Sequence, residues 1–169
     1  MIRLVVDANI VLSALINSRK IKNILIDEKN IGIYAPAYVY FEIVNHYNKV
    51  LKYTSLSENE ILFILIKIIP KRIHICGEHT YYDKIGEAFQ IAKEFDEKDT
   101  PFIALALKLN MPIWTGDRQM IVHGLRAGGY LALDTPAVEG VLSGKNLEEI
   151  KEELKKKISI NSGIFKSKS

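Results

Sequence analysis

Four carboxylates are the residues of this sequence with the clearest capacity for chemistry. Each lies beside a stretch whose apolar pattern predicts a strand or a helix: Asp7, Glu42, Asp99 and Asp117. Carboxylates that lie close together resist ionising beside one another, and a divalent cation relieves that repulsion. A ligand set made only of oxygen suits Mg²⁺ or Mn²⁺, which keep several waters and bridge to phosphates. If the four acids meet in the fold, they predict a site for one or two of these ions.

Predicted strands and helices alternate along the chain. Apolar, β-branched stretches predict four strands and a candidate fifth, at residues 2–6, 30–36, 72–76, 112–115 and 130–133. Apolar residues at helical spacing predict helices at 7–16, 19–28, 37–53, 57–69, 81–95, 100–110, 118–129 and 147–157. This alternation is typical of a three-layer α/β/α fold with a central parallel sheet of four to five strands.

Two of the predicted helices carry boundary signals. Ser57 and Glu60 form the pattern of a capping box, and Pro70 is expected to end the same helix. In the helix at 100–110, a proline lies in the first turn and Asn110 stands at the end.

The four acids are expected to meet at one edge of the sheet. Asp7 directly follows the first strand, and Asp117 follows the fourth after one glycine. Asp99 opens the helix that leads into the fourth strand, and Glu42 lies about two turns into the helix after the second. Ligands of parallel α/β sheets bind beyond the carboxyl ends of the strands. The positions therefore favour one shared site.

Each acid also has a structural interpretation. Asp7, Asp99 and Asp117 each precede a helix, where an aspartate commonly caps the first backbone N–H groups. Glu42 lies among apolar residues, so it is either on a solvated face or buried with a partner, because burial of a lone charge is costly. No His-rich or Cys-rich cluster offers another metal site. The scattered histidines are predicted to be structural or exposed.

Length and composition indicate an ordinary globular chain. It has 169 residues, of which 48% are hydrophobic and 25% charged, so one domain with a real core is expected. Cys76 is the only cysteine, which excludes an internal disulfide. No apolar run approaches the roughly 20 residues that span a bilayer, and the start is not a signal peptide. A cytoplasmic location without membrane contact is the expectation.

The formal net charge of +3 is unevenly distributed. Acids and bases balance through residue 144, so residues 1–144 are predicted to be the main domain. The excess lies in 145–169, predicted to be a charged helix with a flexible basic tail. The main domain thus lacks an obvious basic surface for nucleic acid. Arg118, Arg19 and Lys20, with Arg126, are the candidate phosphate or RNA contacts. The bias toward Ile, Lys and Glu fits a thermophilic source.

Four stretches together resemble the PIN domain, the nuclease fold of VapC-like toxins and of many archaeal stand-alone proteins. They are "VVDANIVLSAL", "APAYVYFEIVN", "DTPFIALALKLNMPIWTGDRQM" and "DTPAVEGVL". The resemblance places the family's acidic quartet on Asp7, Glu42, Asp99 and Asp117. It also places a small polar residue at Asn9 and a Ser/Thr position at Thr115, which would orient carboxylates or bound water.

The resemblance implies a divalent-metal-dependent endoribonuclease. A metal-bound water ionises near neutral pH and can attack a phosphodiester bond. Asp7 and Asp117 would be primary ligands, Asp99 a ligand directly or through water, and Glu42 a ligand of a second ion or a group that positions the attacking water. A homodimer and a small antitoxin partner are also implied. The stretch 53–80 and the segment after 145 are longer than in the smallest toxins, which leaves the toxin role open.

Two other functions were weighed against this one. A catalytically weak or inert PIN-fold subunit that binds RNA or protein fits the neutral main domain and its sparse bases. A phospho-acceptor receiver-like domain fits poorly, because "CGEHT" after the third strand offers no acceptor aspartate and no lysine stands near the last strand.

Overall fold

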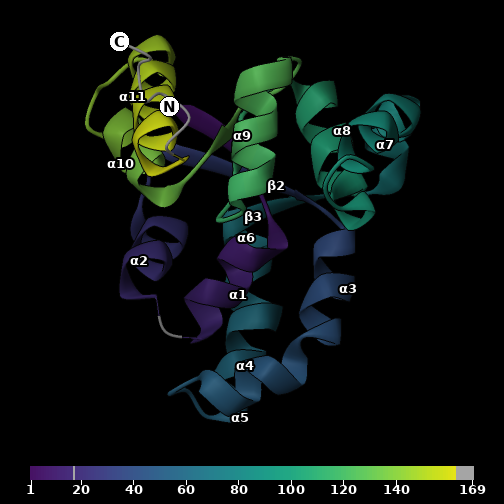
Figure 1. Ribbon diagram of the computed structural model, residues 1–169. Helices are drawn as coiled ribbons and strands as arrows, with labels where there is room; N and C mark the ends of the chain where they lie inside the picture. Colours follow the sequence, from purple (N-terminus) through teal and green to yellow (C-terminus); the bar gives the residue numbers. More distant parts are fainter. Residues whose placement is uncertain (17, 163–169) are drawn as a thin grey trace, which may run out of the picture.

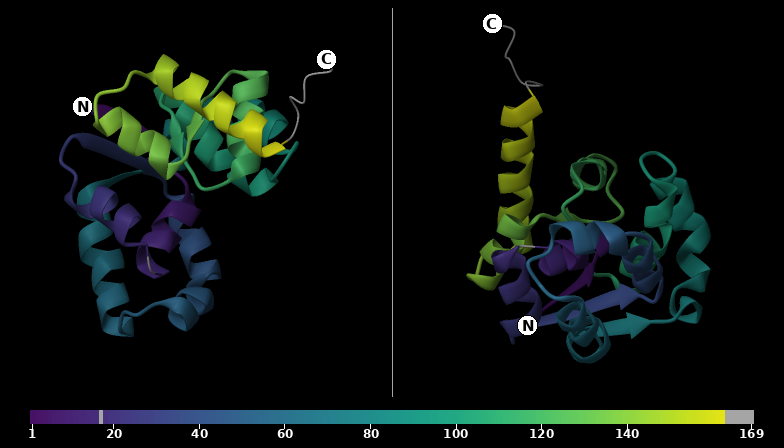
Figure 2. Two further views of the ribbon diagram at one scale, coloured as in Figure 1. Left: turned by 60° about the vertical axis from the view of Figure 1, so that its left-hand side comes forward. Right: turned by 90° about the horizontal axis from the view of Figure 1, so that it is seen from below.

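The computed structural model describes residues 1–16 and 18–162 (Figure 1). Its single sheet has the strands β1 (Ile2–Val6), β2 (Ile31–Pro36), β3 (Ile73–Cys76), β4 (Ile113–Trp114) and β5 (Ala132–Leu133). Their order is β3-β2-β1-β4-β5, and each neighbouring pair is parallel. Helices flank the sheet on both sides (Figure 2). The predicted three-layer α/β/α fold is confirmed, and the candidate fifth strand is present.

Helices fill the connections between the strands. Before β3 they are α1 (Ala8–Ile16), α2 (Arg19–Asp27), α3 (Tyr38–Asn45), α4 (Tyr47–Tyr53), α5 (Glu58–Phe63) and α6 (Ile69–Arg72). After β3 they are α7 (Ile85–Ala92), α8 (Thr100–Leu109), α9 (Arg118–Ala127), α10 (Thr135–Leu142) and α11 (Leu147–Ser162). Within residues 1–16 and 18–162, no helix has the length and apolar character needed to cross a membrane.

Both faces of a parallel sheet are covered, so the buried residues of its strands are apolar. The last three residues of β1 and both residues of β4 and β5 are fully buried. Helix α8 packs against β1, β2 and β4, and its Phe102, Ile103 and Leu105 are buried in the same core. This packing fixes the carboxyl ends of β1 and β4, which are the two strands that precede Asp7 and Asp117.

The chain reverses its direction across the sheet between β1 and β4. From β1 it adds β2 and β3 on one side, and after β3 it returns to place β4 and β5 on the other. A crevice opens at such a switch point, beyond the carboxyl ends of the two central strands, and it is where doubly wound sheets bind ligands. The register pairs Val6 with Trp114, so β1 and β4 end side by side.

The helix predicted over 37–53 is divided into α3 and α4, and the prediction of one continuous helix was wrong. The break is at His46, whose backbone angles (φ −104°, ψ 9°) leave the helical range. The His46 ring nitrogen Nδ1 lies 2.9 Å from the carbonyl oxygen of Glu42, which the His46 backbone N–H also approaches. A side chain that competes for a helix carbonyl bends the helix.

Pro70 does not end its helix, contrary to the prediction. The capping box of Ser57 and Glu60 is confirmed at the start of α5. A π-helical turn over Ile64–Ile68 then leads into α6, with Pro70 in the first turn of α6. Proline lacks an N–H and crowds the carbonyl four residues earlier. The wider π turn, in which the N–H of Ile69 bonds to Ile64, accommodates it and lets the helix continue to Arg72.

Three further boundaries differ from the sequence predictions. Helix α7 covers only the middle of 81–95, and a 3₁₀ turn at Tyr82–Lys84 precedes it. Helix α10 was not predicted. Helix α11 extends past 157 to Ser162; it packs against α10 and α9, and its C-terminal turns project from the body (Figure 2). Ile150 and Leu154 of α11 are buried in the main core. The boundary at 144 stays a prediction, and the tail at 163–169 lies outside the described residues.

Candidate metal centre

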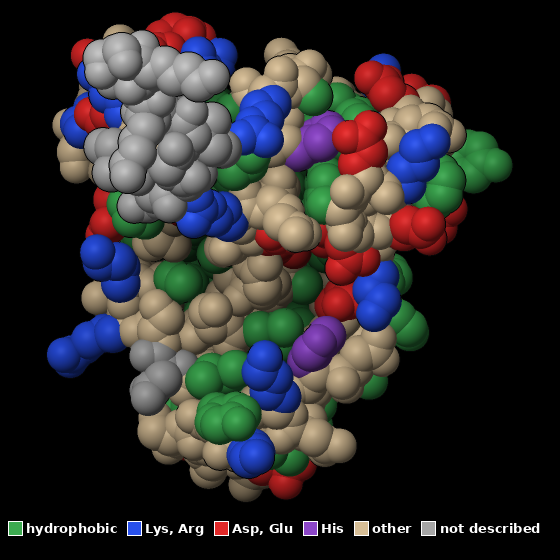
Figure 3. Space-filling model, in the orientation of Figure 1, with side chains coloured by type: hydrophobic (Ala, Val, Ile, Leu, Met, Phe, Trp, Pro, Cys, Tyr) green, Lys and Arg blue, Asp and Glu red, His purple; other side chains and the backbone are tan. Residues whose placement is uncertain are grey.

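All four predicted acids line one cavity of about 270 Å³ at the carboxyl edge of the sheet. In Figure 3, acidic side chains gather in the hollow where the α8–α9 part of the molecule meets the α3–α4 part. The lining residues are Asp7, Ala8, Asn9, Leu12, Glu42, His46, Lys49, Asp96, Lys98, Asp99, Phe102 and Asp117. The cavity therefore receives side chains from the residue after β1, from α1, α3 and α4, from the turn at 96–99 and the first turn of α8, and from the N-cap of α9.

Asp7 is the most enclosed of the four acids, with 4% of its surface exposed. Its backbone N–H bonds to the carbonyl of Trp114 at 3.0 Å and so continues the pairing of β1 with β4. Burial raises the pKa of the Asp7 carboxyl to about 6, and the charge of Asp117 adds to the rise, although hydrogen bonds from Thr115 and from the backbone oppose it. A cation beside Asp7 would favour its charged form.

Two polar side chains hold Asp7 and Asp117 in place. The Thr115 hydroxyl donates to Oδ2 of Asp7 at 2.7 Å and accepts from the backbone N–H of Asp117 at 3.0 Å. The Asn9 amide donates to the same Asp7 oxygen at 2.8 Å, and its oxygen accepts from the Gly116 N–H at 3.1 Å. These contacts tie the end of β1 to the turn after β4.

Replacing Thr115 by Val is expected to lower the free energy of unfolding by about 1–3 kcal/mol, because a fully buried hydroxyl that serves two partners is lost. Thr115→Ser keeps the hydroxyl and is expected to lose clearly less. Urea unfolding of the two variants and the parent measures the difference. Equal midpoints for the Val variant and the parent would show that these hydrogen bonds add no net stability.

Asp117 combines two roles that the sequence presented as alternatives. Its Oδ1 accepts the Gln119 N–H at 2.8 Å, as expected for the N-cap of α9. The same side chain lines the cavity. Capping satisfies one carboxylate oxygen and leaves the other outside the cap bond, so the residue can cap a helix and bind a ligand.

Asp99 occupies the N-cap position of α8, but its side chain makes no cap hydrogen bond. The capping interpretation is therefore wrong for its side chain. Burial raises the pKa of Asp99 to about 8, and the charges of Asp7, Asp96, Asp117 and Glu42 contribute in that order. The negative charges of all four neighbouring acids thus disfavour ionisation of the Asp99 carboxyl.

Glu42 is the acid with the least satisfied side chain. Its Oε1 is buried and has no hydrogen-bond partner within the described part of the chain. Its Oε2 lies 3.9 Å from Nδ1 of His46, one turn along the same helix. The pKa of the nearby Tyr38 hydroxyl is raised, mainly by burial and next by hydrogen bonding to Glu42 and by the charge of Glu42. A buried carboxylate oxygen without a donor is costly unless a cation or water reaches it.

The acids fit a divalent metal in chemistry. All are oxygen donors, two have pKa values raised partly by mutual repulsion, and one carries an orphaned oxygen. As the side chains stand in the described residues, no group of three from His, Cys, Asp and Glu converges closely enough to hold one ion. Binding would therefore draw the carboxylates inward or use waters between them, as Mg²⁺ commonly does.

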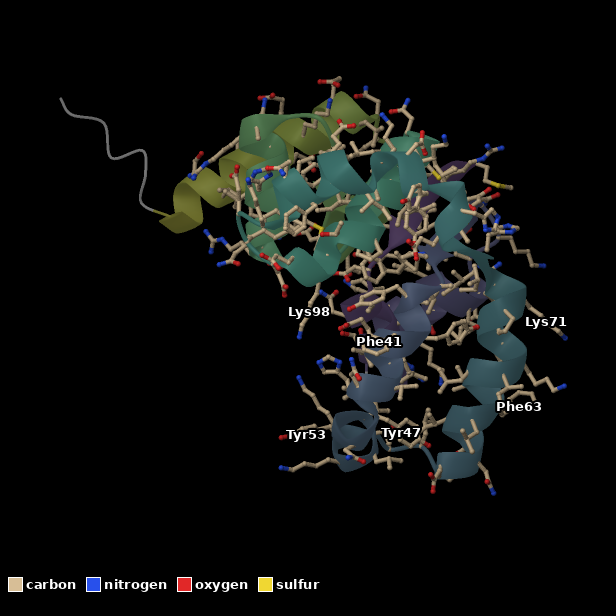
Figure 4. The ribbon with its side chains drawn as sticks, turned by 90° about the vertical axis from the view of Figure 1, so that its right-hand side faces the viewer. Phe41, Tyr47, Tyr53, Phe63, Lys71 and Lys98 are labelled. Atoms are coloured by element: carbon tan, nitrogen blue, oxygen red, sulfur yellow. The ribbon has the colours of Figure 1, made fainter. Side chains whose placement is uncertain are left out.

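The basic residues of the cavity were not among those singled out from the sequence. Lys49 and Lys98 line it, as do His46 and Asp96. Lys98 extends across the gap toward α3, the helix that carries Phe41 (Figure 4). The spacing of 42, 46 and 49, which places three residues on one helical face, was a signal that could have found two of them.

The predicted phosphate contacts lie elsewhere. Arg19 lines a separate cavity of about 240 Å³ between α1, α2 and the loop before α5. Lys20 forms an ion pair with Glu139 at 3.1 Å. Arg118 lines neighbouring hollows beside α9 rather than the acidic cavity. The cavity's own cations are thus Lys49 and Lys98.

The fold and the site define a parallel α/β unit with carboxylates gathered at its switch point. A family model described as PIN domain matches residues 5–158, so this chain belongs to the PIN domain family. PIN domains are generally nucleases. None of the curated proteins matches the chain significantly.

Solved structures show the same fold at low sequence identity. VapBC2 from Rickettsia felis, bound to a DNA fragment from their promoter, matches with TM-score 0.56 and 17% identity over 79% of this chain and 98% of the other. FitAcB from Neisseria gonorrhoeae matches with TM-score 0.53 and 15% identity over 78% and 97%. FitAB bound to the IR36 DNA fragment matches with TM-score 0.52 and 14% identity over 78% and 94%.

Proposed function

We propose that this chain is a divalent-metal-dependent endoribonuclease that cleaves RNA phosphodiester bonds. The observation that carries the proposal is that Asp7, Glu42, Asp99 and Asp117 line one cavity at the switch point, and that Glu42 leaves a buried oxygen unpartnered there. Membership of a nuclease family supports the class of reaction. Mg²⁺ or Mn²⁺ would supply a water acidic enough to attack near neutral pH and would stabilise charge on the phosphoryl oxygens.

The side chains of this chain would divide the work. Asp7 and Asp117, braced by Thr115 and Asn9, would hold the ion at the ends of β1 and β4. Asp99 would share that ion directly or through water, and Glu42 would hold a second ion or position the attacking water. Lys49 and Lys98 would contact the RNA phosphate, since both are cations on the rim of the same cavity.

We also propose that the chain acts as the toxin of a pair with a small antitoxin. The structures similar to it include VapBC2, FitAcB and FitAB, although identities of 14–17% support only the fold. Expression of the chain alone should then halt growth, and expression of the Asp7→Asn variant should not. The predicted homodimer can be tested in the same preparations by sedimentation.

A cleavage assay on the purified protein tests the proposed activity. Labelled single-stranded RNA, hairpin RNA and matching DNA would be incubated with Mn²⁺, Mg²⁺ or EDTA, beside Asp7→Asn. We expect cleavage of RNA that needs the metal and is lost in the variant. RNA that stays intact in every condition, together with absent metal binding by calorimetry, would overturn the nuclease and favour the inert binding subunit.

A further inference from the structure

A second hollow lies beside the acidic cavity and has more than twice its volume, about 590 Å³. It is formed by one face of α9 and by the turn that follows α7. Its lining residues are Glu94, Phe95, Arg118, Gln119, Val122, His123, Arg126 and Ala127. The volume falls within the roughly 300–1,000 Å³ typical of pockets for small ligands. We call this hollow the α9 groove.

Two arginines stand at the ends of the α9 groove. Arg118, Val122 and Arg126 are spaced four residues apart, so they form one stripe along the helix. Eight residues of α-helix rise about 12 Å, which separates the two arginine backbones by two turns. Neither guanidinium forms a salt bridge or hydrogen bond within the described residues. The groove therefore offers two uncommitted cations with apolar surface between them.

Aromatic rings form the wall between the arginines. The Phe95 and His123 rings lie 5.3 Å apart, and His123 stacks on Tyr130 with ring centres 5.9 Å apart. The Tyr130 hydroxyl donates to the Met120 carbonyl at 2.9 Å and lies 3.2 Å from Nδ1 of His123. The other ring nitrogen of His123 lies 3.0 Å from the Glu94 carboxylate. The ring is held from both sides, as a fixed stacking surface.

The α9 groove adjoins the acidic cavity through two pairs of consecutive residues. Asp117 lines the cavity and Arg118 the groove; on the facing wall, Asp96 lines the cavity and Phe95 the groove. An RNA strand with one phosphate among the acids would thus reach the α9 groove within one or two nucleotides of that phosphate.

We propose that the α9 groove binds the nucleotides of single-stranded RNA that flank the scissile phosphate. Arg118 and Arg126 would contact two phosphates of the strand, and a base between them would stack on Phe95 and His123. The proposal rests on the proposed nuclease function. Charge favours nucleic acid over a protein segment, because in the described part of the chain the two arginines have no ion-pair partner, whereas the acid of the groove, Glu94, lies 3.0 Å from His123.

Salt-dependent RNA binding tests the phosphate contacts. Binding of a labelled 12-nucleotide single strand would be measured by anisotropy in EDTA, in an Asp99→Asn background that should not cleave. For single strands the slope of log K against log salt is about −0.7 per phosphate contact. Arg118→Gln with Arg126→Gln should therefore reduce the slope by about 1.4 and weaken binding at least tenfold at low salt. Arg3 is an exposed arginine near the start of β1, at the end of the strand away from the acidic cavity. The control Arg3→Gln should change neither the salt slope nor the affinity.

Base stacking is tested separately. Phe95→Leu keeps an apolar side chain but removes the ring, and should weaken binding roughly fivefold or more. RNA carrying 5-iodouridine should cross-link to peptides that contain Phe95 or His123, and the yield should fall in the variant. Cross-links confined to other surfaces, or absent RNA binding at low salt, would overturn the proposal.

The two proposals fail in different ways. If the double arginine variant keeps the salt slope while the parent protein cleaves RNA with metal, the α9 groove does not bind the RNA. The nuclease proposal then stands, and a protein segment becomes the candidate occupant of the groove. A reduced slope in a protein that never cleaves would keep the groove as an RNA site and remove the nuclease.

Discussion

Asp117→Asn is expected to lower metal-dependent RNA cleavage by at least about 100-fold with little loss of stability. A metal that stabilises the charge of the transition state contributes several kcal/mol, and each 1.4 kcal/mol is a tenfold change in rate. Asn caps a helix as well as Asp does, so the bond from Asp117 Oδ1 to the Gln119 N–H is retained in kind. Only the anionic oxygen offered to the cavity is lost.

Asp134→Asn is the control for that variant in activity; in stability it also loses the ion pair of Asp134 Oδ2 with Lys157 at 2.5 Å. Asp134 follows β5 as Asp117 follows β4, and its Oδ1 caps α10 through the Ala137 N–H at 2.9 Å. It does not line the acidic cavity. Single-turnover cleavage and thermal unfolding of both variants should distinguish the helix-capping role of Asp117 from its proposed role as a metal ligand. Equal losses of activity in the two would mean that Asp117 serves only as a cap.

The sequence predicted the parts of the fold where one local signal dominates. Mostly apolar, β-branched stretches predicted all five strands, because a parallel strand is largely buried on both faces. Breaks inside helices were not predictable in the same way. The division at His46 depends on one ring that reaches the Glu42 carbonyl, and the passage of Pro70 depends on a π turn. Helix α10 begins with residues typical of a helix start, Asp134 and Pro136, but no helix was predicted over its short apolar stretch.

The spacing of residues in the sequence predicted only part of the site, because it does not show which elements pack against one another. Asp7 and Asp117 could be placed at one edge because both follow predicted strands, and the carboxyl ends of parallel strands meet there. Glu42 was found because an acid within an apolar helix requires a reason. Asp96 and Lys98 were missed, since an exposed charge in a loop gives no sign of the cavity that it lines. Lys49 was missed although its spacing from Glu42 places it on the same helical face. The α9 groove likewise depends on α9 lying beside the end of α7.

The metal-free protein is expected to lose stability as pH rises from about 4 to about 8. In the folded chain the pKa values of Asp7 and Asp99 are raised from 3.8 to about 6 and about 8, mainly by burial. In that window the folded state holds protons that the unfolded state has released, so folding is favoured at the acidic end and the advantage is lost as pH rises. Mn²⁺ should reverse this trend, because it favours the ionised carboxyls.

Asp99→Asn should therefore raise the melting temperature in EDTA at pH 8 by at least about 3 °C, with much less gain at pH 5, where Asp99 is already neutral. The same variant should gain less than the parent from added Mn²⁺ at pH 8. Asp83→Asn is the control, and it is expected not to raise the melting temperature at pH 8. Its pKa is shifted in the opposite direction, because a hydrogen bond from Lys108 lowers the pKa of that exposed carboxyl. Differential scanning fluorimetry at both pH values, with EDTA or Mn²⁺, measures all of these changes. If Asp99→Asn and the parent melt together at pH 8 in EDTA, neither burial of the Asp99 charge nor repulsion from the neighbouring acids destabilises the fold, and the case for a cation among them weakens.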